Sequence, residues 1–184
     1  MFIQTEQTPN PATLKFLPGR AVMSAGTADF TDAEAARRSP LAERLFLIDG
    51  ITGVFLGADF ITITKRDDKE WFLLKPAILG VIMEHFTAGH PVILAADDAD
   101  DLGAAGEDNE VVRQIKELLD TRVRPAVAQD GGDIIFRSFE DGVVYLHMQG
   151  ACSGCPSSTA TLKMGIENML RHYIPEVVEV RPVL

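Results

Sequence analysis

Hydrophobic residues in the first half of the chain follow two patterns, short runs typical of strands and longer stripes typical of helices. The run at 12–17 closes at Pro18-Gly19, and the runs at 54–56 and 61–64 are separated by Gly57-Ala-Asp59, which predicts a hairpin. Ser39-Pro40 predicts a helix start, because serine can accept hydrogen bonds from the free amides of the first turn and proline fits the first helical position.

A second helix of this half is expected to open at Pro76, after an extended stretch at 71–74. Apolar residues then recur at helical spacing as far as Gly89, where we expect the helix to end. His85 and His90 have no cysteine or paired carboxylate at ligand spacing. This half therefore shows no catalytic constellation.

The second half predicts the order helix, strand, strand, helix, strand. A helix begins at about Glu110 and is ended or kinked by Pro125. Strands at 134–139 and 143–149 are joined by Asp141-Gly142, a pair suited to a tight hairpin. A second helix starts at Pro156, and Pro175 separates it from a last strand around Val178 and Val180.

The strand at 143–149 alternates cleanly between apolar and polar positions. Val144, Leu146 and Met148 share the face expected to be buried. His147 lies on the other face, with Tyr145 and Gln149, and is expected to face solvent.

Between the two halves, residues 98–109 carry five acidic and no basic side chains, half of the net charge of −10. The segment is also poor in bulky apolar residues, so it cannot offset the entropy cost of ordering. We expect two small α+β domains, at 1–97 and 110–184, joined by an acidic flexible linker at 98–109. A solvated loop within one domain is the alternative.

Composition argues against several classes of protein. No apolar run approaches the roughly 18 residues that cross a bilayer, and the residues after Met1 show no targeting segment. Phosphate binding needs clustered lysine and arginine, so the acidic charge argues against a nucleic-acid partner. Two cysteines three positions apart cannot build a secreted disulfide scaffold, which favours a reducing compartment.

The chemistry of the chain concentrates in Gly150-Ala-Cys-Ser-Gly-Cys-Pro156. Two thiols on one loop can point at a common centre, and the amides of the following helix are expected to lower their pKa. An iron-sulfur cluster held by cysteine alone takes four thiolates, and this chain has two, Cys152 and Cys155. Two chains would supply four, around an exposed cluster that is easily surrendered.

Other interpretations of the two thiols stay open at this point. A thiol-disulfide oxidoreductase also places such a pair between a strand and a helix, although no tryptophan precedes Cys152. Structural zinc would need two further ligands, for which His147 and His172 are the nearby candidates. The flanking glycines and serines disfavour two buried packing cysteines, and hydrolase or transferase chemistry would need a base that the sequence does not place.

The second half resembles the C-terminal domain of the Nfu/NifU family of iron-sulfur cluster scaffold and carrier proteins. The motifs are Gln129-Asp-Gly-Gly-Asp133, Gly150-Ala-Cys-Ser-Gly-Cys-Pro-Ser-Ser158 and Leu162-Lys-Met-Gly-Ile-Glu-Asn-Met-Leu170. The first half resembles the family's N-terminal domain through Gln7-Thr-Pro-Asn-Pro11, Leu14-Lys-Phe-Leu-Pro-Gly19, Val54-Phe-Leu-Gly-Ala-Asp-Phe-Ile-Thr-Ile-Thr64 and Trp71.

The resemblance implies a non-enzymatic homodimer that holds a [4Fe-4S] cluster on Cys152 and Cys155 of two copies. A [2Fe-2S] cluster would use the same four thiolates. It implies that the cluster comes from upstream assembly proteins and passes to recipient apoproteins, and that residues 1–97 tune partner contact. A bacterial cytoplasm, or an organellar matrix for a processed form, would fit. Cys152→Ser and Cys155→Ser are expected to abolish cluster binding and to leave the fold intact.

Overall fold

The computed structural model describes residues 2–94, 109–152 and 156–183, with side chains for all of these except 156–159. It divides into two compact units, Met1–Ala96 and Asp97–Leu184. Each unit combines helices with a sheet, so the expectation of two α+β domains is confirmed. Apart from Asn109, the expected linker at 98–109 lies outside the described residues.

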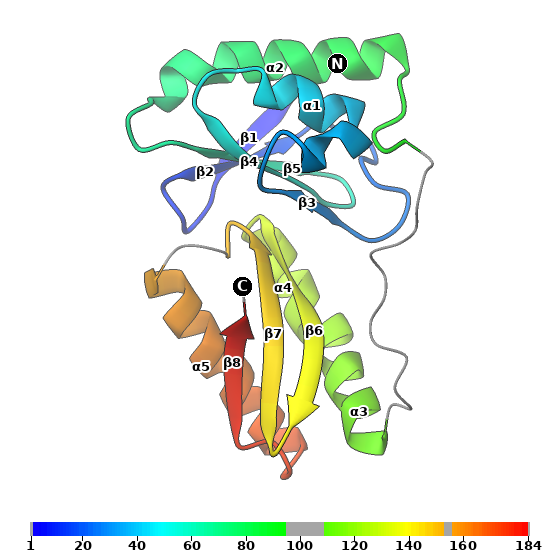
Figure 1. Ribbon diagram of the computed structural model, residues 1–184, viewed down its shortest axis with the longest axis vertical. Helices are drawn as coiled ribbons and strands as arrows, with labels where there is room; N and C mark the ends of the chain where they lie inside the picture. The colour runs from blue at the N-terminus through cyan, green and yellow to red at the C-terminus, as the bar shows by residue number, and fades with distance from the viewer. Residues whose placement is uncertain (1, 95–108, 153–155, 184) are drawn as a thin grey trace. The chain divides into compact units, whose positions relative to one another are not determined.

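The first unit is a five-stranded antiparallel sheet with its helices on one face (Figure 1). The strand order is β1-β2-β5-β4-β3. The strands are β1 (Gln4–Gln7), β2 (Thr13–Leu17), β3 (Ala28–Phe30), β4 (Ile51–Leu56) and β5 (Ile61–Lys65). The helices are the short η1 (Ala35–Arg38), α1 (Pro40–Phe46) and α2 (Trp71–Ala88).

The core of this unit lies between the sheet and the helices. Alternate residues of the central strands, such as Phe16 and Ile63, are fully buried there, as are Leu45 of α1 and Ile78 and Ile82 of α2. Burial in α2 recurs at helical spacing, as the sequence pattern predicts. In the central strands both faces are buried, since Lys15 and Thr62 are buried as well as their apolar neighbours. The predicted β4–β5 hairpin is confirmed.

Two of the predicted helix boundaries follow from local chemistry. Ser39 precedes α1, and its Oγ accepts a hydrogen bond from the Ala42 amide at 3.1 Å. Gly89 ends α2 with a φ of 71°, in the left-handed region that glycine adopts without strain. Both boundaries are confirmed.

The start of α2 differs from the expectation. The helix begins at Trp71, so the prediction that 71–74 are extended is wrong, and Pro76 lies inside the helix. Pro76 is the sixth residue of the helix, past the first amides that have no partner within it, so it removes one backbone hydrogen bond. Burial of Leu74 on the same face as Ile78 offsets that loss.

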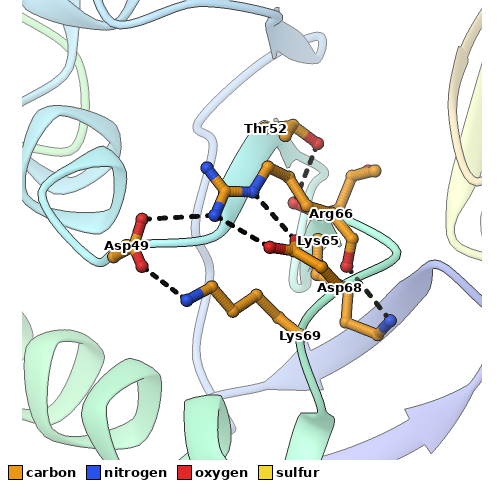
Figure 2. A network of polar contacts seen from close by, with 7 residues as sticks. Asp49, Thr52, Lys65, Arg66, Asp68 and Lys69 are labelled. Atoms are coloured by element: carbon orange, nitrogen blue, oxygen red, sulfur yellow. Dashed lines mark hydrogen bonds and ion pairs between the residues drawn. The ribbon is translucent and has the colours of Figure 1, made fainter.

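A network of exposed ion pairs joins the two connections that flank the β4–β5 hairpin (Figure 2). Asp49 accepts Lys69 Nζ at 2.6 Å and lies 3.5 Å from the Arg66 guanidinium, which also binds Asp68 at 3.0 Å. These pairs lower the pKa of Asp49 and Asp68, and water screens their contribution to stability. They order the loop that leads into α2.

The second unit is a three-stranded sheet with all its helices on one face. Strands β6 (Gly132–Glu140) and β7 (Val143–Gly150) are antiparallel, and β8 (Glu179–Val183) runs parallel to β7. The helical segments are α3 (Glu110–Leu118), η2 (Leu119–Val123), α4 (Arg124–Gln129) and α5 (Pro156–Tyr173). The predicted order is confirmed.

Burial in this unit follows the predicted alternation of β7. Val144 and Leu146 are fully buried and Met148 nearly so, against Ile115 of α3 and Ile166 of α5. The hairpin turn has positive φ at Asp141 and Gly142, as expected. In the described ranges, no helix is long and apolar enough to cross a membrane.

Pro125 does not end the first helical stretch of this unit. The wide-turned segment η2 precedes Pro125, and the helical path resumes as α4 and continues to Gln129. A proline has no amide to donate, so the preceding turn widens to accommodate the missing hydrogen bond.

Candidate functional site

Cys152 lies two residues beyond the end of β7, next to the residues at the start of β6. Gly150 has a φ of 64°, and the Ala151 amide donates to the Gly131 carbonyl at 3.2 Å. Gly131 itself has a φ of 81° at the end of α4. Gly131 and Gly150, both in the left-handed region of φ, thus allow the cysteine loop to contact the turn before β6.

Gly132 is the point of closest approach. A Cβ at this position would lie 2.6 Å from Cys152 Sγ, 2.7 Å from the Gln149 carbonyl oxygen and 3.1 Å from the Cys152 amide nitrogen. Real Cβ atoms do not approach so closely, so only glycine fits without movement of the loop or the strand. The motif at 129–133 and the motif at 150–156 therefore meet in one packed contact, between Gly132 and Cys152.

Cys152 is buried, with 6% of its surface exposed, and it packs in the core of the second unit. The expectation that the two cysteines are not buried packing residues is therefore wrong for Cys152. Burial, together with the negative charges of Asp130 and Asp133, raises the pKa of the Cys152 thiol to about 12. The expected lowering of the pKa by helix amides is also wrong for Cys152, because burial and two carboxylates outweigh them.

A buried ion pair lies next to this contact, and sequence reasoning did not find it. Asp133, 3% exposed, accepts two hydrogen bonds from Arg124, both at 2.9 Å, and its Oδ1 also accepts the Ile134 amide at 2.8 Å. Arg124 donates a third bond to Asp120 at 3.0 Å, and the pair raises the pKa of Arg124. The only sequence signal was Asp133 in the glycine motif, because nothing in the sequence couples it to an arginine nine positions earlier.

Cys155 lies outside the described residues. The helix expected to follow it is present, since α5 begins at Pro156. Ile166 and Leu170 are the buried large apolar side chains of its described part, and Tyr173 at its end is 48% exposed.

The zinc alternative also needs Cys155, which lies outside the described residues. Within the described ranges, no group of three or more histidine, cysteine, aspartate or glutamate side chains could hold a metal ion. His147 is half-buried on the open face of the sheet, paired with Ile135 and Val183, so the expectation that it faces solvent is only partly met. The His172 ring lies edge-on to the ring of Tyr173, with 5.0 Å between the ring centroids.

Comparison with known families assigns both units. The family described as "Scaffold protein Nfu/NifU N terminal" matches residues 3–89, and the family described as "NifU-like domain" matches residues 115–181. A human protein named "NFU1 iron-sulfur cluster scaffold homolog, mitochondrial" is 54% identical over 185 residues, and the alignment covers 100% of this chain and 72% of the human one. The chain belongs to the Nfu family.

Other Nfu relatives are equally similar. The Drosophila sechellia protein with the same name is 55% identical over 184 residues, covering 100% of this chain and 65% of its own length. The Arabidopsis thaliana protein "NifU-like protein 5, mitochondrial" is 54% identical over 181 residues, covering 96% of this chain and 66% of its own. This chain thus spans about two thirds of the length of these Nfu relatives.

Proposed function

We propose that this protein is an iron-sulfur cluster carrier that holds one cluster on Cys152 and Cys155 of two copies and passes it to recipient apoproteins. The observation that carries the proposal is the placement of Cys152. It sits at the end of β7 in the NifU-like unit, held by the Gly132 contact, three residues before Cys155 and with α5 starting directly after that residue. The relatives' names include iron-sulfur cluster scaffolds.

The donor chemistry fits such a cargo. Thiolates are the ligands that iron-sulfur clusters take, and a set of four requires a second chain, because each chain has two cysteines. We propose a [4Fe-4S] cluster, with [2Fe-2S] as the other type that four thiolates hold. We propose a role in transfer because two chains that share a cluster can come apart when the cluster leaves.

The second candidate, a thiol-disulfide oxidoreductase, is less well supported. Its first cysteine has to be an exposed thiolate of low pKa to attack a disulfide. Cys152 is buried, and its pKa is raised to about 12. The oxidoreductase would therefore start from an almost wholly protonated, inaccessible nucleophile.

The proposed partners are a second copy, upstream cluster-assembly proteins and recipient apoproteins, with the first unit tuning contact with the recipients. Three relatives carry the word mitochondrial in their names, which supports the organellar compartment over the bacterial cytoplasm as the proposed location.

The test is anaerobic reconstitution with iron and sulfide, followed by sizing with iron, sulfide and Mössbauer readout. About four irons and four sulfides per two chains, lost in Cys152→Ala, would support the shared [4Fe-4S] cluster. About two of each would mean [2Fe-2S]. A metal-free monomer with a reversible Cys152–Cys155 disulfide would refute the carrier and favour the oxidoreductase.

A further inference from the structure

The ion pair between Arg124 and Asp133 lies beside the contact that covers the Cys152 thiol. Arg124 is the first residue of α4, and Asp133 is the second residue of β6. Asp133 also directly follows Gly132, the residue against which Cys152 Sγ packs. The pair therefore ties the start of α4 to the start of β6, with the turn between the two elements closed behind it.

The geometry of the pair fixes both distance and direction. Arg124 Nε donates to Asp133 Oδ1 and Nη2 donates to Oδ2, each at 2.9 Å, which makes two parallel bonds between one guanidinium and one carboxylate. Asp120, one turn earlier, holds the same guanidinium through Nη1 at 3.0 Å. Because the Asp133 carboxylate is buried, water screens this pair less than a surface pair. The first residues of β6 are thus anchored to α4.

Backbone contacts connect this anchor to the cysteine loop. Gly132 pairs with Gly150 in the register of β6 and β7, and the Ala151 amide donates to the Gly131 carbonyl at 3.2 Å. The next residue is Cys152, which is buried. The ion pair, the turn and the covered thiol therefore form one connected element of the second unit.

We propose that Arg124 is a positioning residue for the cluster ligand: through Asp133 it holds Gly132 against Cys152 and keeps the thiol covered in the metal-free chain. A cluster shared by two chains lies between them, so its ligands have to reach the surface. The turn at 131–133 and the cysteine loop therefore have to separate before a cluster is loaded. Only the identity of Cys152 as a ligand rests on the proposed function, because the covering of the thiol needs no iron.

The first test measures how often the wild-type thiol is uncovered. Mass spectrometry follows alkylation of Cys152 by iodoacetamide in the full, reduced, metal-free chain, relative to the rate in the urea-unfolded chain at the same pH. Native-state hydrogen exchange follows the Ala151 amide. Both probes are expected to report the same local opening, which occurs more often than the opening that exposes the amides of the central strand β7. Exposure of the thiol only through global unfolding would overturn the proposal.

The second test uses Arg124→Lys, which keeps the positive charge but cannot make the two parallel bonds. Alkylation of Cys152 is expected to be about tenfold faster than in the wild type, because a hydrogen bond to a buried charge is lost. Val177→Ala is the matched control. Val177 is buried in the core of the same unit just before β8, which pairs with Val143 at the far end of β7 from Gly150. This variant lowers the free energy of unfolding without touching the pair and should be alkylated at the wild-type rate.

Equal alkylation rates in the wild type and Arg124→Lys, or an equal increase in Val177→Ala, would overturn the proposal. The wild-type measurement decides the question should Arg124→Lys not fold. Iron and sulfide uptake is followed in parallel, and Arg124→Lys is expected to load faster than the wild type to the same final content, whereas slower loading would also overturn the proposal. A wild type that takes up no cluster, while the difference in alkylation persists, would refute the carrier function and not the covering of the thiol.

Discussion

Gly132→Ala tests the packing of the cysteine loop most directly. Gly132 does not have a positive φ, so alanine is allowed by the backbone and the substitution reports only the contact. The added methyl would lie 2.6 Å from Cys152 Sγ and 2.7 Å from the Gln149 carbonyl oxygen. The carbonyl belongs to β7, so relief requires that the cysteine loop or the β6–β7 pairing moves.

Overpacking of this kind costs about 1–3 kcal/mol. In a unit of this size, a loss of about 2 kcal/mol lowers the unfolding midpoint by roughly 8–16 °C. Calorimetry of the full chain measures that midpoint, and the first unit serves as an internal reference. Gly165→Ala, where the new Cβ meets nothing within 4 Å, should instead stabilise the same unit by about 0.5–1 kcal/mol. An unchanged midpoint in Gly132→Ala would refute the close contact.

Four further predictions follow from the structure. Cys152→Ala should abolish cluster binding yet stay folded, with its free energy of unfolding lowered by roughly 1–2 kcal/mol, as measured by iron content and calorimetry. Arg124→Met leaves the buried Asp133 carboxylate without its guanidinium and should cost about 3 kcal/mol in urea unfolding, part of which returns when Asp133→Asn is added.

Burial raises the pKa of Asp29 to about 6, so the folded chain holds an unfavourable charge above that pH. Asp29→Asn should therefore raise the free energy of unfolding by about 2 kcal/mol at pH 8, and this gain should disappear as the pH falls from 6 to 4. Urea unfolding at each pH measures the gain, and Asp67→Asn is the control that should change the free energy of unfolding little. Removal of residues 1–97 should leave cluster content unchanged and slow delivery to some recipients in a transfer assay.

Much of the fold could be predicted from the sequence because its signals are local. The alternation of β7, the Asp141-Gly142 turn and the Ser39 cap each depend on a few neighbouring residues, and all are present in the structure. The start of α2 was missed because Pro76 is also a strong helix-start signal, and only the tertiary burial of Leu74 reveals the earlier turn. The edge strands β1 and β3 were missed because they are short and lack a clear alternation.

In the candidate site too, local patterns predict some features, and contacts between distant residues decide the others. Motif spacing predicts Cys152 as a ligand but not its burial, because the contact with Gly132 joins residues twenty positions apart. Glycines and serines around a cysteine are typical of exposed loops, and here the glycines instead permit close packing. The role of Arg124 depends on the path of α4 beside β6, which no local pattern encodes.

The burial of Cys152 would change how the proposed carrier works. Binding a cluster would require Cys152 to lose its proton. Burial and the two aspartates raise the pKa of this thiol, so at a fixed pH they would weaken its binding to iron, by about 1.4 kcal/mol for a tenfold smaller thiolate fraction. The same proton would return when a cluster left, and the thiol is packed in the core of the second unit in this structure. In the proposed carrier, protonation and burial of Cys152 would therefore favour release to recipients whose thiols are deprotonated more easily. That balance suits delivery better than storage.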